Sequence, residues 1–124
     1  MSIFSRDNNP ATYLIRSFKK GQIQINDIIY KNSIIVSAHC VIENWAPHRV
    51  TDITQQHLAQ AATLKPKILI IGTGVEQHFI ALDLYGDLLN QGIGVEIMST
   101  PAACRTYHAL TAEGREVVAA LLLE

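Results

Sequence analysis

The segment from Thr100 to His108 carries the side chains of this sequence that are most capable of chemistry. Its sequence, TPAACRTYH, places Cys104 and His108 four residues apart, so that both lie on one face of a helix. A thiol near a helix N-terminus with an imidazole beside it is a sensible nucleophile and base. The alternative is a small buried thiol and an ordinary helix-face histidine. Because no neighbouring acidic or amide residue is placed to orient His108, we expect no catalytic residue and leave Cys104 as a candidate reactive thiol.

Two turns suggest a second kind of chemistry, the binding of an anion. Gly72, Thr73 and Gly74 follow one predicted strand, and Ser99 and Thr100 follow another. In an open α/β sheet the carboxyl ends of such strands meet at one edge, where ligands commonly bind. The free amides of two helices starting there would favour an anion. The alternative is that the glycines only make tight turns between a strand and a helix.

Nucleotide motifs are incomplete in these turns. The dinucleotide fingerprint Gly-x-Gly-x-x-Gly requires a third glycine, where this chain has Gln77. Glu96 lies at a suitable distance along the chain to contact a ribose, which keeps the dinucleotide alternative open. A phosphate-binding Walker loop is excluded because no glycine is followed by lysine and then serine or threonine.

The remaining polar residues show no metal or cofactor pattern. Arg105 and Arg115 are candidates for contacting an anion or a partner's carboxylate, with surface ion pairs to Glu113 or Glu116 as the alternative. The five histidines have no metal-ligand spacing relative to the two cysteines. We therefore expect neither a metal nor a cofactor. Trp45 is the only tryptophan and is expected to fill the core.

Composition indicates one domain over residues 1–124, with residues 1–11 as a poorly ordered tail. Apolar residues make up 48% of the chain and charged residues 17%, which is enough apolar material for a core. The net charge is −1 and no basic run is present, so nucleic acid is not an expected partner. No segment has the length of a membrane span and the N-terminus does not resemble a signal peptide. With two cysteines and no disulfide framework, we expect a cytoplasmic location.

The pattern of apolar residues predicts the α/β class. Residues 12–50 contain short alternating segments separated by turns, which is typical of an antiparallel β meander. The second half then reads as β-α-β-α with a parallel pair of strands. The predicted elements are a helix from Thr54 to Ala62, a strand over Lys67–Ile71, a helix after Gly74 that includes Phe79 and ends at Asn90–Gly92, a strand over Ile93–Ile97, a helix opened by Ser99–Pro101, and a last helix over Glu113–Leu123.

Three segments together resemble a known family of uncharacterised function: Lys67–Gly74 (KILIIGTG), Gly92–Glu96 (GIGVE) and Thr100–Tyr107 (TPAACRTY). This family is catalogued as a domain of unknown function and includes a mitochondrial complex I assembly factor. The resemblance implies a compact, layered β/β/α domain with no established enzymatic activity. The family usually has asparagine at the position of His108, so this histidine either keeps the hydrogen bond of that amide or adds sensitivity to pH.

We therefore expect a non-enzymatic binding or assembly protein. It would contact a protein partner through the edge formed by Gly72–Gly74 and Thr100–Arg105, with His108 close by. The alternative is a site for a small molecule, anion or nucleotide, with or without chemistry at Cys104. The sequence identifies neither partner nor ligand, and it leaves open a homo-oligomer.

Overall fold

A mixed five-stranded sheet forms the centre of the molecule. The computed structural model describes residues 9–124. The strand order is β5-β4-β8-β6-β7. The central strand β8 pairs parallel with β6 and antiparallel with β4, and β6 pairs parallel with β7 on its other side. These strands are β4 (Ile34–Ser37), β5 (Val41–Ile42), β6 (Ile68–Thr73), β7 (Gly94–Met98) and β8 (Val117–Leu122).

A smaller antiparallel sheet is built from β1 (Ile15–Lys19), β2 (Gln22–Ile25) and β3 (Ile28–Tyr30), in that order. Its two turns contain Gly21 and Asn26, whose φ angles of 86° and 52° lie in the left-handed region that these residue types tolerate best. The predicted meander is confirmed for these three strands. The following strand, β4, joins the larger sheet.

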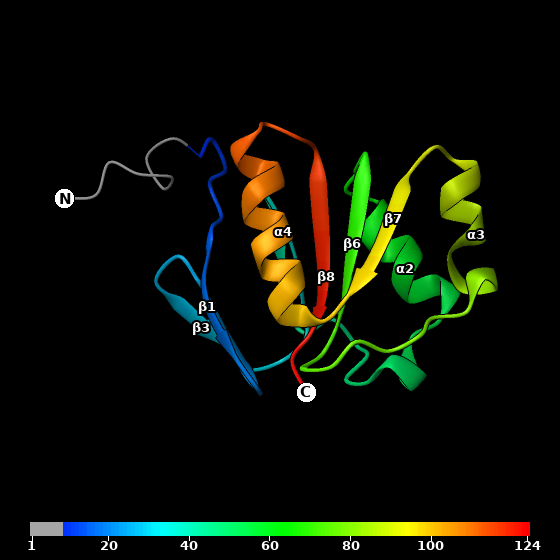
Figure 1. Cartoon of the computed structure of the whole chain (residues 1–124), viewed down its shortest axis with the longest axis horizontal. Coiled ribbons are helices and arrows are strands. Elements are labelled where there is room, and N and C mark those ends of the chain that lie inside the picture. The colour runs from blue at the N-terminus through cyan, green and yellow to red at the C-terminus, as the bar shows by residue number, and fades with distance from the viewer. Residues whose placement is uncertain (1–8) are drawn as a thin grey trace.

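Helices and the small sheet cover the two faces of the five-stranded sheet (Figure 1). The helices α2 (Gln55–Ala62) and α3 (Leu82–Asn90) pack on one face. The helix α4 (Thr100–Ala112) and the three-stranded sheet lie on the other. A short 3-10 turn, η1 (Val50–Asp52), precedes α2. The layered α/β class is thereby confirmed.

Alternation along the central strands divides the interior into two cores. Leu69 and Ile71 of β6 face the core beneath α2 and α3, and Ile70 faces the core beneath α4, as the period of a strand requires. Trp45 fills the first core and is only 1% exposed. Its indole nitrogen donates to the carbonyl oxygen of His57 at 3.2 Å. The expected role of Trp45 in the core is confirmed.

The helix predicted over Glu113–Leu123 is wrong, because Val117–Leu122 form strand β8. Helix α4 ends at Ala112, and Gly114 then takes a φ of 75°, which lets the chain turn back towards the sheet. Every residue from Val117 to Leu122 is buried. A surface helix would need a polar face, whereas a central strand covered on both sides does not. Helix α4 is therefore the crossover that brings β8 parallel to β6.

The helix after Gly74 also begins later than predicted. Helix α3 starts at Leu82, and residues 74–81 form a loop. Phe79, expected on the apolar face of that helix, lies in this loop and is 84% exposed. The glycine-rich turn therefore joins a strand to a loop, and the second helix N-terminus expected at this edge is absent there.

The described part of the predicted N-terminal tail is attached to α4. Asn9 is buried, and its side-chain amide donates to the hydroxyl of Thr111 at 3.0 Å and to the carbonyl oxygen of His108 at 3.3 Å. Its side-chain oxygen accepts from the amide of Ala11 at 2.9 Å. Residues 1–8 of the predicted tail lie outside the described residues.

Candidate functional site

The side chain of Thr100 joins three segments that lie far apart in the sequence. Its hydroxyl accepts a hydrogen bond from the amide of Gly74 at 2.9 Å and donates one to the carbonyl oxygen of Leu122 at 2.6 Å. The amide of Thr100 donates in turn to the carbonyl oxygen of Gly74 at 2.7 Å. Thr100 is fully buried, so water does not compete for these bonds. We refer to Thr100, Gly74 and Leu122 as the Thr100 latch.

Close packing at the latch requires both glycines. A Cβ atom on Gly72 would lie 2.8 Å from Oγ1 of Thr100 and 2.8 Å from Cδ2 of Leu121. Gly74 has a φ of 105°, and a Cβ atom there would overlap the carbonyl oxygen of Glu124. The glycines therefore let β6 approach α4 and the end of β8. The space that could have admitted a ligand is occupied by the chain itself.

The amides at the start of α4 are already paired within the chain. Ser99 is the N-cap, and its hydroxyl accepts from the amide of Ala102 at 3.4 Å. The carbonyl oxygen of Ser99 accepts from the amide of Ala103 at 2.8 Å. The amide of Thr100 belongs to the latch, and Pro101 has no N–H to donate. The predicted anion site is therefore not formed here, because the donors that it needs have acceptors.

Thr73 organises the loop that follows β6. Its hydroxyl donates to the carbonyl oxygen of Glu76 at 2.8 Å and accepts from the amide of His78 at 3.0 Å. The amide of Val75 donates to the carbonyl oxygen of Glu124 at 2.9 Å. The first part of the loop is thus hydrogen-bonded to the end of β6 and to Glu124, and Ile80, near its other end, is buried in the core beneath α2 and α3. The dinucleotide alternative loses support, because this glycine-rich turn does not open a helix.

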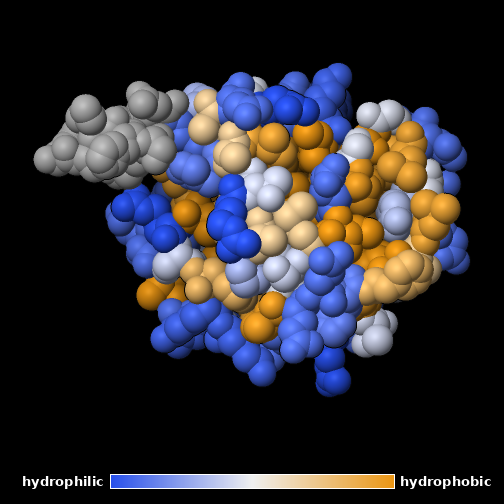
Figure 2. Space-filling view, in the orientation of Figure 1, coloured by the Kyte–Doolittle hydropathy of each residue, from blue (hydrophilic) through white to orange (hydrophobic). Residues whose placement is uncertain are grey.

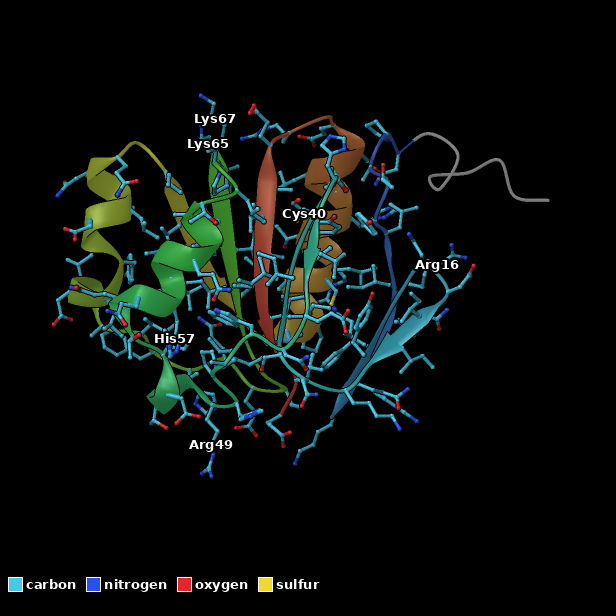
Figure 3. The ribbon with its side chains drawn as sticks, turned by 180° about the vertical axis from the view of Figure 1, so that it is seen from behind. Arg16, Cys40, Arg49, His57, Lys65 and Lys67 are labelled. Atoms are coloured by element: carbon cyan, nitrogen blue, oxygen red, sulfur yellow. The ribbon has the colours of Figure 1, made fainter. Side chains whose placement is uncertain are left out.

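This loop and the first residue of α3 carry three exposed apolar side chains, which we call the Phe79 patch: Val75, Phe79 and Leu82. Their exposed fractions are 43%, 84% and 59%. Beside Phe79 lies a hollow of about 470 Å³ whose wall includes His48 and Arg49. Figure 2 shows hydrophobic surface gathered on the side of the molecule that carries α3, and Figure 3 shows Arg49 extending away from the sheet into solvent.

Cys104 lacks the ionisation expected of a reactive thiol. Burial raises its pKa to about 12, although the charge of Arg105 acts in the opposite direction. Since the thiolate is the nucleophilic form, a thiol at neutral pH is a poor nucleophile. Burial likewise raises the pKa of Tyr107, whose hydroxyl donates to the carbonyl oxygen of Tyr13 at 2.7 Å. Cys104 is partly buried and packs against the core beneath α4.

Arg105 and His108 lie apart from the latch. Together with Cys104 they line a surface hollow of about 300 Å³ between α4 and β1, which includes Arg16. The edge predicted as one site is therefore divided: Gly72, Gly74 and Thr100 are internal, while Arg105 and His108 face this hollow. Two exposed residues beside these hollows, Phe79 and Arg16, were not among the predicted site residues. An isolated phenylalanine after the polar run of Glu76 to His78 was the available signal for the Phe79 patch.

The other charged candidates form weak surface contacts. Arg115 lies 3.6 Å from Glu113, and both side chains are more than half exposed, so this ion pair contributes little to stability. Among residues 9–124, no three histidine, cysteine or carboxylate side chains gather closely enough to hold a metal ion.

Comparison with known proteins places this arrangement in a family. Residues 15–122 match the family described as "Protein of unknown function (DUF498/DUF598)". The chain belongs to this family. The match covers both sheets, the latch and the loop that carries Phe79. The resemblance recognised from the sequence is thereby confirmed.

Relatives of this chain carry different descriptions. A Francisella tularensis protein named "13 kDa major membrane protein" is 28% identical, and the match covers 94% of this chain and 96% of that protein. The human "NADH dehydrogenase [ubiquinone] 1 alpha subcomplex assembly factor 3" is 29% identical, with 98% of this chain matched to 66% of the human protein. No helix among residues 9–124 is both long enough and apolar enough to cross a bilayer. The cytoplasmic location inferred from the sequence stays a prediction.

Solved structures confirm the fold. A Bordetella parapertussis protein superposes with a TM-score of 0.87 at 39% identity, and the match covers 92% of this chain and 98% of that one.

Proposed function

We propose that this chain is a non-enzymatic protein-binding domain of the assembly-factor type, and that the Phe79 patch is the principal contact surface. The observation that carries the proposal is the 84% exposure of Phe79 on a loop whose backbone is fixed by the buried hydroxyl of Thr73. Grouped, exposed apolar side chains mark interaction sites on globular proteins.

Because the loop is already ordered, binding does not carry the entropic cost of ordering it. A partner that covers Phe79 and Leu82 gains the burial of apolar area without having to order the loop first. Phe79 lies beside a hollow that polar residues line, among them His48, Arg49 and Glu124. An apolar anchor with a polar rim is the arrangement that protein interfaces have.

In this proposal the edge formed by Gly72–Gly74 and Thr100 does not contact the partner but holds the loop that does. Thr100 and Gly74 hold the end of β6 against α4, and Thr73 shapes the loop that starts there. The relatives named as assembly factors of NADH dehydrogenase motivate an assembly role for this chain as well. The raised pKa of Cys104 argues against covalent catalysis as the alternative.

A pair of matched variants tests the proposal. Tagged full-length protein, Phe79→Ser and Ile29→Ser would be used to capture partners from cells that express the protein. Ile29 is 50% exposed on the distant strand β3, so it controls for the general loss of surface apolarity. We expect a stoichiometric partner with the unmodified and Ile29→Ser proteins and its loss with Phe79→Ser. Equal capture by all three proteins would refute the proposal. Thermal unfolding followed by Trp45 fluorescence shows that each variant is folded.

A further inference from the structure

The surface between β1 and α4 forms a second groove that the proposed contact at Phe79 does not use. We call it the β1–α4 groove. It has a volume of about 300 Å³; Ile15 and Phe18 line it from β1, and Cys104 and His108 line it from α4. Arg16 and Arg105 lie on its two opposite walls. Its lining is therefore apolar with a basic border.

The wall contributed by β1 is the free edge of a sheet. Strand β1 pairs with β2 on one side, and no strand among the described residues pairs with its other side. Figure 1 shows β1 running beside α4, with β3 farther from this helix. A free edge presents unpaired N–H and C=O groups to an incoming extended chain. Adding a strand there is one of the standard ways in which domains bind peptides.

A β-bulge lies at the N-terminal end of this edge. The register pairs Ile15 with Ile25 and Ser17 with Gln24, so two neighbouring residues of β2 face three residues of β1. Arg16 is the extra residue. Bulges redirect side chains and interrupt regular pairing. Arg16 borders the groove at this bulge, and the regularly paired part of the strand, Ser17 to Lys19, follows it.

The basic border has no matching acid among the residues that the structure describes. Neither Arg16 nor Arg105 has a carboxylate within 4.0 Å among residues 9–124, where the ion pair found is Arg115 with Glu113. Arg105 and Arg16 are both exposed. Two guanidinium groups that border an apolar groove are complementary to carboxylates, which they bind in bidentate geometry.

We propose that the β1–α4 groove binds an extended, acidic segment of a partner protein, which pairs with β1 as an additional strand. Side chains of a strand alternate between its faces. The set of side chains that faces α4 would cover Ile15 and Phe18 and carry carboxylates to Arg16 and Arg105, which border the same groove, and the other set would face away from α4. The inference rests on the proposed protein-binding function but uses a different surface, so each can fail alone.

A random peptide library displayed on phage tests the composition of the segment. We expect selection on the folded full-length chain to enrich peptides that carry both acidic and apolar residues at every second position, so that they share one face of the strand. Their binding should weaken about tenfold with Arg105→Glu and about as much with Arg16→Glu. Arg115→Glu, which makes the same change of charge elsewhere, should leave binding unchanged. Enrichment of neutral or basic peptides, or equal binding by all three variants, would overturn the proposal.

Nuclear magnetic resonance of the labelled chain with one synthesised peptide tests the strand geometry. Amide shifts should concentrate at residues 15–18 and 104–108. Because only alternate amides of an added strand face β1, N-methylation of one alternate set should abolish binding while methylation of the other set is tolerated. Equal effects of both sets would contradict strand addition. If inorganic phosphate produces the same shifts, the groove binds a simple anion and the proposal is wrong. If raising the protein concentration alone produces them, the groove binds a second copy of the chain and the proposal is also wrong.

Discussion

Thr100 and Gly74 hold each other by two hydrogen bonds in opposite directions. The hydroxyl of Thr100 accepts from the amide of Gly74 at 2.9 Å, and the amide of Thr100 donates to the carbonyl oxygen of Gly74 at 2.7 Å. The residues are 26 positions apart in the sequence. This pair fixes the start of α4 to the end of β6, and through it the loop that presents Phe79.

Replacing Thr100 with valine should destabilise the protein by about 1–3 kcal/mol, because the buried amide of Gly74 loses its acceptor and the carbonyl oxygen of Leu122 loses its donor. Thr100→Ser keeps the hydroxyl and should retain most of the stability. Urea denaturation followed by Trp45 fluorescence measures both variants. A Thr100→Val protein as stable as Thr100→Ser would show that the hydroxyl contributes nothing.

Gly72→Ala should also destabilise the protein, by about 1–3 kcal/mol. Its Cβ would lie 3.1 Å from the Cα of Thr100 and closer still to two side-chain atoms, so backbone must shift. Gly86→Ala is the matched control, since a Cβ there meets nothing within 4 Å in the middle of α3. It should stabilise the helix by about 0.5–1 kcal/mol. In the same denaturation experiment, the free energy of unfolding should fall for Gly72→Ala and rise for Gly86→Ala.

The sequence predicted those elements that have local signals. Thr54 caps α2 and Ser99 caps α4, as expected from their hydroxyls. The alternation of Ile23 and Ile25 correctly predicted β2. In these cases the side chain that indicates the element also makes the hydrogen bond or apolar contact that forms it.

Strand β8 could not be assigned in the same way. Its run from Val117 to Leu122 is apolar throughout, which fits a buried helix as well as a buried strand. The choice is decided by β4 and β6, which offer their edges to it and come from distant parts of the chain. The structure of the candidate site could not be predicted for the same reason. The end of β8 supplies Leu122 to the latch and occupies the space expected for an anion.

Cys104 provides a prediction about pH. In the unfolded chain a cysteine ionises near pH 8.5, whereas burial raises the pKa of Cys104 in the fold to about 12. The stability due to the buried neutral thiol is therefore complete below about pH 8.5 and is lost as pH rises towards the folded value. In that window the unfolded state binds fewer protons than the folded state, so the free energy of unfolding falls with rising pH.

The measurement compares Cys40→Ser with Cys40→Ser/Cys104→Ala by urea denaturation between about pH 7 and pH 10.5, a range that brackets the unfolded value. Above about pH 9 the single variant should lose stability faster than the double variant, by at most about 1.4 kcal/mol for each pH unit. Both variants keep Tyr107, whose pKa burial also raises, so the difference isolates the thiol. Parallel pH profiles, together with rapid alkylation of Cys104 by iodoacetamide at pH 7, would instead mean that the thiol ionises readily in the fold and would restore its candidacy as a nucleophile.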